Sequence, residues 1–186
     1  RVAVVVSAPG EMTDELIGLA KRVASDPDPR ELDQLMATGE LVGVSLFAMA
    51  CRAKGAPAVS LSGPQAGFHC EGSPTLSTIT AIRPRRVLAE MAAGNIVAVA
   101  GFQALAPNGD TATLGRGGSD LSAVALAAVL KAERCDIFTD VKGVYTADPR
   151  VVPDARQLKR LSYSEMLELS SAGAQVMLAR SIEVAQ

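Results

Sequence analysis

The sequence predicts an α/β fold, in which the strands of a largely parallel sheet alternate with helices that cover both of its faces. Three observations predict this fold. Residues 2–6 are a continuous run of valine and alanine, which is typical of a parallel strand buried on both faces. Similar runs alternate along the chain with segments whose apolar residues recur at helical spacing. Polar, glycine-containing loops follow several strands, where open α/β sheets bind their ligands.

The elements are expected in the following order. Strands are predicted at residues 2–6, 56–61, 78–82, 95–100 and 135–139, with a β-ribbon at residues 103–114 that turns at Asn108-Gly109. Helices are predicted after caps at Thr13 and Asp14, as two abutting helices within residues 30–54 that meet near Thr38-Gly39, and at residues 84–94, 119–130, 163–170 and 174–185. Residues 62–74 are expected to form a long polar loop.

Composition limits the class of protein. The chain has 186 residues, of which 48% are hydrophobic, so it can bury a core and we expect one domain over residues 1–186. The net charge of −2 argues against a nucleic-acid partner. The basic run Arg83, Arg85 and Arg86 is interpreted as a solvated helix start. No apolar run is judged to approach membrane length, so no membrane partner is expected.

The cysteine and histidine content indicates neither a metal site nor nucleophilic catalysis. The three cysteines have no metal-ligand spacing and cannot pair evenly, so we interpret them as reduced thiols of a cytoplasmic protein. They are Cys51, Cys70 and Cys135. His69 is the sole histidine, and a lone histidine in a loop is more often incidental than catalytic.

The strongest local signal is the segment from Thr111 to Asp120, in which three glycines flank Arg116 directly before an apolar helix. Ser119 is a good N-cap residue, and the negative charge of Asp120 suits the first helical turn. Glycines expose backbone N–H groups at the helix N-terminus and Arg116 adds a cation, so the segment predicts an anion site. The alternative is an ordinary glycine-rich turn before a core helix.

Common phosphate-binding motifs do not match this loop. A P-loop needs a Lys-Ser/Thr pair after its second glycine, and the loop has none. A dinucleotide fingerprint needs a third glycine where Asp120 stands, although the acid Asp140 near the end of the following strand keeps that alternative open.

Three loops, at residues 7–14, 101–120 and 140–150, are expected to meet at one edge of the sheet. Glu40 lies outside these loops, at the predicted start of a helix and beside Gly39. Its carboxylate could favour the helix dipole, or it could face a cleft and bind an ammonium group.

Six segments, in order along the whole chain, resemble the aspartokinases of the amino acid kinase superfamily. They are Ser7-Ala-Pro-Gly-Glu-Met-Thr-Asp-Glu-Leu16, Thr38-Gly-Glu40, Gly101-Phe-Gln103, Leu114-Gly-Arg-Gly-Gly-Ser-Asp120, Thr139-Asp-Val-Lys-Gly-Val-Tyr-Thr-Ala-Asp-Pro-Arg150 and Gly173-Ala-Gln-Val176. The resemblance implies a three-layer αβα sandwich on a mainly parallel sheet. It also implies transfer of the γ-phosphoryl group of ATP, with Mg²⁺, to the side-chain carboxylate of L-aspartate, the first step of lysine, threonine and methionine biosynthesis.

The resemblance implies a role for individual residues. Arg116 would grip a substrate carboxylate, Glu40 would meet the α-ammonium group, and Asp120 would orient a phosphate-binding lysine. The catalytic pair would be Arg116 and Asp120. The other residues implied for the substrate site are Ser7, Thr13, Phe102, Gly117 and Gly118. The residues implied for the nucleotide are Thr139, Asp140, Tyr145, Arg150 and Gln175, and none is implied as a metal ligand.

Two departures from the family pattern leave alternatives open. The family opens with a strand and a Lys-Phe-Gly-Gly-Thr-Ser motif, and this chain is expected to begin after it and to end before the regulatory ACT domains. Gln175 stands where the family usually has a lysine. The alternatives are a module that binds amino acid or nucleotide without turnover, and a sister kinase for acetylglutamate or uridylate. The full-length protein is expected to be a homo-oligomer.

Overall fold

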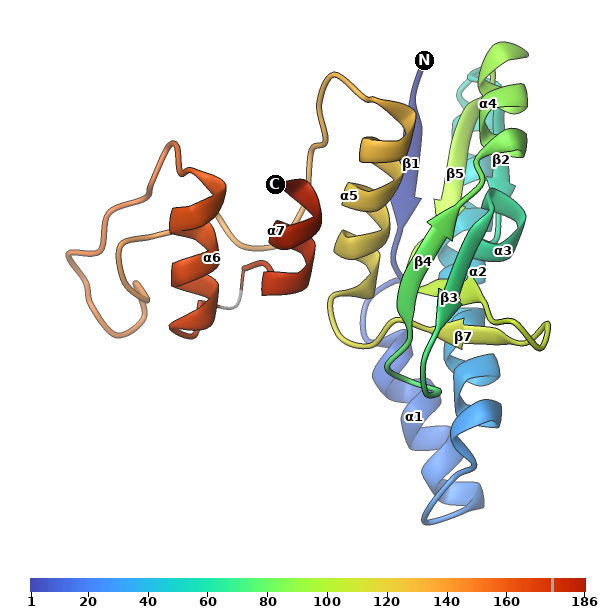
Figure 1. The fold of residues 1–186 in the computed structure, drawn as a ribbon, viewed down its shortest axis with the longest axis horizontal. Helices are drawn as coiled ribbons and strands as arrows, with labels where there is room; N and C mark the ends of the chain where they lie inside the picture. The colour runs from blue at the N-terminus through green and yellow to red at the C-terminus, as the bar shows by residue number, and fades with distance from the viewer. Residues whose placement is uncertain (175) are drawn as a thin grey trace.

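The computed structural model describes residues 1–174 and 176–186 and arranges them as helices around two sheets (Figure 1). Within these residues, three parallel strands form one sheet in the order β1-β5-β2, with bounds β1 Ala3–Val6, β2 Ala58–Leu61 and β5 Ile96–Ala100. The other sheet has the order β4-β3-β6-β7, with bounds β3 Phe68–Glu71, β4 Thr78–Ile82, β6 Gln103–Leu105 and β7 Thr111–Thr113. The helices are α1 Met12–Val23, α2 Pro29–Ala53, α3 Gly63–Ala66, α4 Arg85–Ala92, α5 Gly118–Leu130, α6 Tyr163–Ser171 and α7 Ala179–Ala185.

The central strand β5 separates two layers of helices. Val97 and Val99 point to one face and pack in a core that contains residues of α4 and α5. Ala98 and Ala100 point to the opposite face and pack against Val44 of α2. All four strand residues are buried, as the alternation of side chains along a strand requires. The predicted α/β fold with helices on both faces of a parallel sheet is therefore confirmed, and β5 is the central strand of that sheet.

Residues 29–53 form one helix, so the prediction of two helices meeting near Gly39 was wrong. Asp28 caps the helix, because its carboxylate accepts the backbone N–H of Glu31 at 3.1 Å. A glycine inside a helix costs about 1 kcal/mol relative to alanine. Here it permits close packing, since a Cβ atom at Gly39 would lie 3.0 Å from the Cβ atom of Ala8. Tertiary contact therefore overrides the local helix-breaking signal.

The continuity of α2 also corrects the expectation that no apolar segment reaches membrane length. Among the described residues, α2 is the one helix long and apolar enough to cross a bilayer, with a mean hydropathy of 1.4 in its most apolar window. The core helix of a folded domain meets the same criteria. Val44 and Phe47 pack on the sheet, so burial against β5 accounts for one apolar face of α2, whereas Leu41, Val42, Leu46 and Met49 of the same helix are exposed.

Residues 62–74 are not the continuous loop that was predicted. Ser62 and Gln65 form a capping box that begins the short helix α3. The chain then enters β3, which carries His69 and Cys70 and pairs antiparallel with β4 and parallel with β6. The predicted β-ribbon is confirmed, because β6 and β7 pair antiparallel from Gln103 opposite Thr113 to Leu105 opposite Thr111.

The predicted strand at residues 135–139 does not form. One edge of β1 pairs with β5, and the other edge has no strand partner within residues 1–174 and 176–186. A groove of about 1140 Å³ lies along that edge, and residues 132–138 form part of its wall. A strand needs a hydrogen-bonding neighbour, and this groove separates residues 132–138 from β1. Phe138 is consequently 94% exposed.

The last two helices lie on the outer side of α5. Figure 1 shows α7 beside α5, with α6 farther from the sheets, and α7 contacts both helices. The predicted helix at residues 163–170 is confirmed as α6, whose start is a capping box between Ser162 and Glu165. The helix predicted from residue 174 begins later, at Ala179.

Candidate functional site

A cavity of about 280 Å³ lies at the carboxyl end of β1, where the chain turns into α1. Its walls come from four separate parts of the sequence, brought together by the fold. The lining residues are Ser7, Ala8, Thr13, Glu40, Phe102, Arg116, Gly117, Gly118, Ser119 and Asp120. The structure thus gathers in one cavity all the residues that the sequence predicted for the substrate and for catalysis.

Glu40 is the buried acid of this cavity. Its side chain projects from α2 and is only 3% exposed. One carboxylate oxygen, Oε1, accepts the backbone N–H of Ala8 at 3.3 Å, while Oε2 is buried and has no hydrogen-bond partner among the described residues. Burial raises the pKa of Glu40 to about 7. A buried carboxylate oxygen without a partner favours a bound donor, such as an ammonium group.

Phe102 holds an unusual backbone conformation at the wall of the cavity. Its φ of +65° lies in the left-handed region, which is uncommon for a non-glycine residue. The conformation is fixed at both ends, because the Phe102 N–H donates to Ser122 Oγ at 3.1 Å and the Phe102 carbonyl accepts the Leu114 N–H at 2.9 Å. Ser122 Oγ also donates to the Gly118 carbonyl at 2.7 Å. Phe102 is therefore tied to the start of α5.

Helix α5 begins at Gly118, and Gly117 is its N-cap, so the prediction of Ser119 as the N-cap was wrong. Gly117 has a φ of +69°, and a Cβ atom there would lie 2.5 Å from the Leu178 side chain. Only glycine meets both conditions without strain. Ser119 instead lies inside the first turn. The Gly118 N–H donates to the Gly115 carbonyl at 2.9 Å and the Leu121 N–H to the Gly117 carbonyl at 3.1 Å, so the N–H donors that the start of α5 presents to the cavity are those of Ser119 and Asp120.

The start of α1 also differs from the prediction. The N-cap of α1 is Glu11, which makes no side-chain capping bond, and the helix begins at Met12. Thr13 and Asp14 therefore lie inside the first turn and do not cap it. Thr13 lines the cavity, whereas Asp14 does not.

Arg116 is exposed and stands at the cavity between β7 and α5. Its backbone is held from the far side by Arg180 of α7. The Arg180 guanidinium donates to the Leu114 carbonyl at 2.7 Å and to the Arg116 carbonyl at 3.2 Å. The anchored backbone leaves the Arg116 side chain available for an anion.

Asp120 lies in the first turn of α5, where the cavity meets the groove beside β1. Burial raises the pKa of its carboxyl group. Ser7 and Ser119 line both spaces as well. These three polar residues therefore lie where the small cavity and the larger groove adjoin.

The residues predicted for the nucleotide do not line the small cavity. Thr139, Asp140 and Arg150 are exposed on the segment that follows the groove. Arg150 forms an ion pair with Asp148 at 2.8 Å, which raises the pKa of Arg150 and lowers that of Asp148. Tyr145 is half-buried and forms a single β-bridge with Gln157. Gln175, also predicted for the nucleotide, lies outside the described residues.

Two lining residues, Ala8 and Ser119, were not predicted. Each is adjacent in sequence to a predicted residue, so the loops were identified but their full lining was not. Ala8 contributes its backbone N–H to Glu40, a role that leaves no side-chain signal. In the part of the chain that the structure describes, no three His, Cys, Asp or Glu side chains are grouped so that they could hold a metal ion.

Comparison with known proteins shows which proteins the chain resembles. The chain matches the amino acid kinase family over residues 1–186. It is 53% identical over 188 residues to an aspartokinase of Geobacillus stearothermophilus, which covers 100% of this chain and 46% of that protein. It is 51% identical to aspartokinase 2 of Bacillus subtilis, with 100% of this chain and 46% of that protein covered. The chain thus spans less than half the length of the curated relatives it matches.

Solved structures agree with this match. An aspartate kinase from Synechocystis superposes with a TM-score of 0.83 at 44% identity, covering 98% of this chain and 30% of that chain. Aspartokinase III of E. coli, in complex with aspartate and ADP, superposes with a TM-score of 0.82 at 30% identity, covering 94% of this chain and 40% of that chain.

Proposed function

The chain belongs to the amino acid kinase family, and we propose that the protein containing it transfers the γ-phosphoryl group of ATP to the side-chain carboxylate of L-aspartate. We further propose that residues 1–186 form most of a single catalytic domain. The observation that carries the proposal is the cavity in which a buried, half-partnered Glu40 carboxylate faces the same space as Arg116. The aspartokinase relatives, with up to 53% identity, support it.

The cavity suits a small amino acid that carries an extra acid. Its volume of about 280 Å³ lies below the roughly 300–1,000 Å³ of pockets for drug-sized ligands. In the proposed complex the α-ammonium group donates to Glu40 Oε2. A substrate carboxylate accepts two parallel hydrogen bonds from the planar guanidinium of Arg116. Ser7, Thr13 and Phe102 complete the wall around the substrate. Opposite charges on the two sides of the cavity fix the orientation of the zwitterion.

The proposed reaction requires positioning and charge neutralisation more than covalent chemistry. An oxygen of the aspartate side chain forms a bond to the γ-phosphorus, the bond between that phosphorus and the β–γ bridging oxygen breaks, and ADP leaves. The N-terminus of α5, with the backbone of Gly117 and Gly118, is proposed to face the phosphates with the positive end of the helix dipole. The Gly118 N–H itself donates to the Gly115 carbonyl at 2.9 Å, so the donors for a phosphate are the N–H groups of Ser119 and Asp120. Asp120, in the same turn, is proposed to orient a lysine that binds the phosphates. Mg²⁺ is proposed to enter with ATP and to neutralise phosphate charge.

The nucleotide is proposed to bind where the small cavity adjoins the groove, beside Ser7, Ser119 and Asp120. Thr139 and Asp140 follow the wall of that groove, and they are proposed to flank the nucleotide. Tyr145 would supply an aromatic surface, and Arg150 would exchange its Asp148 partner for phosphate oxygens. Gln175 is proposed to contact a phosphate by its neutral amide.

The test is a coupled ADP-release assay on the full-length protein with ATP and Mg²⁺, in the presence and absence of L-aspartate. We expect ADP release that depends on aspartate and does not occur with acetylglutamate or uridylate. Isothermal titration of aspartate and of ADP accompanies the assay. Binding of either ligand without aspartate-dependent ADP release would contradict the proposed kinase and would support a binding module.

A further inference from the structure

A second buried acid, Asp33, lies on α2 two turns before Glu40. Its side chain is 1% exposed. No ion pair between residues of the described chain includes it. A buried carboxylate without a cation is costly unless hydrogen bonds satisfy its oxygens. The hydrogen-bond donors around the Asp33 carboxylate therefore indicate its role in the structure.

The Asp33 carboxylate joins α2 to two other segments. Both of its oxygens accept the backbone N–H of Thr75, each at 3.0 Å. Oδ2 also accepts the backbone N–H of Thr113 at 3.1 Å, and Oδ1 accepts the Thr113 hydroxyl at 2.6 Å. Thr75 lies in the turn between β3 and β4, and Thr113 is the last residue of β7. One carboxylate thus fixes three elements to one another.

Each of these elements leads directly to the proposed substrate site. Glu40 follows Asp33 by seven residues, which places the two side chains on one face of α2. Arg116 follows Thr113 by three residues. Thr75 touches the intervening loop, because a Cβ atom at Gly115 would lie 2.9 Å from the Thr75 carbonyl oxygen. Asp33 therefore links α2, which carries Glu40, to the end of β7, which leads to the cation Arg116.

Thr75 also shows that this link is built under constraint. Its φ of +67° lies in the left-handed region, where a β-branched residue is a genuine outlier. Strained residues persist when their surroundings hold them. The two bonds from the Thr75 N–H to Asp33 supply such support, and the Ser77 N–H donates to the Thr113 carbonyl at 3.1 Å beside them.

We propose that Asp33 is a positioning residue that sets the separation between Glu40 and Arg116, and thereby matches the cavity to the length of a four-carbon dicarboxylic amino acid. The inference rests on the proposed function. Asp33 does not touch the substrate, since it does not line the cavity. It acts through the two residues that bind the ends of the zwitterion.

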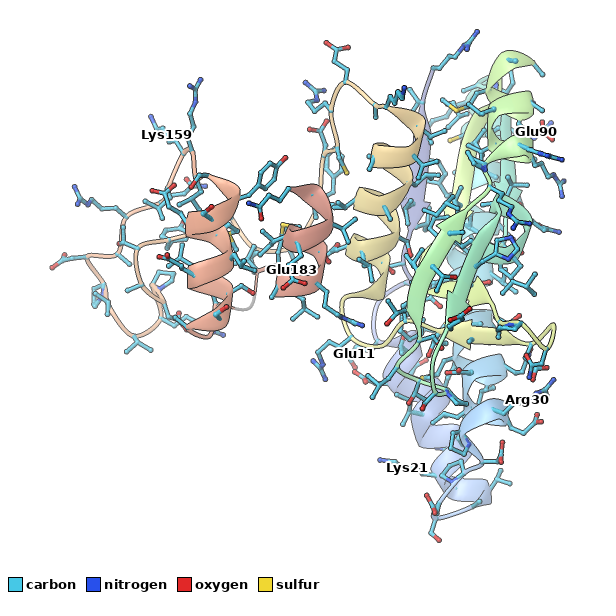
Figure 2. The ribbon with its side chains drawn as sticks, viewed as in Figure 1. Glu11, Lys21, Arg30, Glu90, Lys159 and Glu183 are labelled. Atoms are coloured by element: carbon cyan, nitrogen blue, oxygen red, sulfur yellow. The ribbon has the colours of Figure 1, made fainter. Side chains whose placement is uncertain are left out.

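The chain offers a matched control for this proposal. Arg30, which is labelled in Figure 2, also lies on α2. Its guanidinium forms an ion pair with Asp110 in the β6–β7 turn at 2.7 Å. This contact joins the same helix to the same ribbon, but it is exposed and leads to no residue of the cavity. The change Asp110→Asn therefore weakens a contact between α2 and the ribbon without disturbing the site. The change Asp33→Asn removes one acceptor oxygen and places an amide NH₂ against N–H donors.

The experiment measures steady-state kinetics of full-length protein with L-aspartate, L-glutamate and ATP. For Asp33→Asn we expect the aspartate KM to rise about 10-fold or more. We expect the preference in kcat/KM for aspartate over glutamate to fall by a similar factor of about 10, because binding-pocket discrimination depends on such geometry. The ATP KM of Asp33→Asn should change less than about twofold. For Asp110→Asn, the aspartate KM, the preference for aspartate over glutamate and the ATP KM should each change less than about twofold.

A purely structural role for Asp33 would give a different result. Asp33→Asn would then lower kcat in proportion to the folded fraction, with unchanged aspartate KM and unchanged preference for aspartate, and that outcome would overturn the proposal. Should Asp33→Asn fail to fold, Thr113→Val removes only the 2.6 Å hydroxyl bond and keeps the backbone donor. We expect this variant to raise the aspartate KM about threefold. An unchanged aspartate KM in folded Thr113→Val would also contradict the inference about Asp33. A wild-type protein without activity would instead overturn the proposed function, and this inference with it.

Discussion

The amino-acid side and the nucleotide side of the proposed active site are built in different ways. The amino-acid side gathers residues from α1, α2, the loop after β5 and α5 into one cavity, and its central acid, Glu40, is 3% exposed. Most residues of the proposed nucleotide side lie in one segment, residues 139–150, whose polar contacts are made within the segment or with residues 156–158. Thr139 bonds its neighbour Asp140, and Arg150 pairs with Asp148 two residues away. The amino-acid side is preorganised by the core, whereas the nucleotide side is held by contacts among residues close together in the sequence.

This difference predicts which kinetic parameter each residue controls. Groups fixed by the core act on a ligand without rearranging, so their loss should affect both binding and chemistry. Exposed local ion pairs contribute little to stability and exchange partners readily. Substitutions on the nucleotide side should therefore have smaller effects, confined to the nucleotide.

The largest expected effect is that of Arg116→Ala. A cation about 4 Å from a carboxylate contributes roughly 4 kcal/mol at an effective dielectric near 20, and solvent screening of this exposed side chain lowers the figure to about 2–3 kcal/mol. We expect kcat/KM for aspartate to fall roughly 100-fold, through a higher aspartate KM and a lower kcat. The ATP KM should stay nearly constant. Arg116→Lys, which keeps the charge but not the fork, should be intermediate, and unchanged kinetics in Arg116→Ala would remove Arg116 from the site.

The next effect concerns Glu40 and pH. The pKa of Glu40 is about 7 in the folded protein, so the carboxylate that binds the ammonium group is lost as pH falls through 7. For the wild type we expect kcat/KM for aspartate to decline below pH 7 with a slope approaching one. Glu40→Gln should abolish that decline. It should also lower kcat/KM at pH 8 by roughly 30-fold, because the ammonium group loses its charged partner. A wild-type profile that is flat from pH 5.5 to 8 would exclude Glu40 as the titrating group.

The same substitution should change stability in the opposite direction. Because the pKa of Glu40 rises on folding, its contribution to stability is present below about pH 4.5 and is lost as pH rises to about 7. At pH 8 the unliganded wild type therefore holds a buried charge that Glu40→Gln removes. We expect the free energy of unfolding to increase by up to about 3 kcal/mol at pH 8 and to change little at pH 5. Denaturant titration of unliganded full-length protein at both pH values measures this.

The smallest effect is expected on the nucleotide side. Arg150→Ala should raise the ATP KM about fivefold and leave the aspartate KM unchanged, since the side chain reaches phosphate only by leaving Asp148. Asp148→Asn, which frees Arg150, serves as the control and should leave the ATP KM equal or slightly lower. A change in the aspartate KM of Arg150→Ala would mean that the two sides are coupled, contrary to the comparison.

The parts of the fold that could be predicted are those governed by local chemistry. Continuous apolar runs identified β1, β2 and β5, and Asn108-Gly109 identified the β6–β7 ribbon. Two of the three loops predicted to meet at one edge, residues 7–14 and 101–120, do line the cavity, because residues at the carboxyl ends of parallel strands meet there. The third, residues 140–150, does not line the cavity, and the strand expected before it does not form. The glycine-rich loop itself indicated Arg116 as part of an anion site, and the sequence left Glu40 open between the helix dipole and an ammonium group. Their specific roles toward a substrate came from the resemblance to known kinases, and the structure brings both residues to one cavity.

The parts that failed depend on contacts distant in sequence. Gly39 is a helix breaker by itself, but Ala8 packs against it and α2 continues. Ser119 is a good cap by composition, but the left-handed Gly117 starts the helix earlier. Residues 135–139 have strand composition, yet pairing is a property of two segments and not of one. Asp33 gave no signal, since an acid within a helix is ordinarily a solvated side chain.

One edge of β1 has no strand partner among residues 1–174 and 176–186, and this has a practical consequence for the laboratory. An apolar strand with free N–H and C=O groups is a template on which another chain adds a strand. A recombinant fragment limited to residues 1–186 should therefore self-associate along β1 as its concentration increases, even where each copy is folded. Colloidal behaviour, rather than thermal denaturation, would then limit crystallisation and NMR work on that fragment.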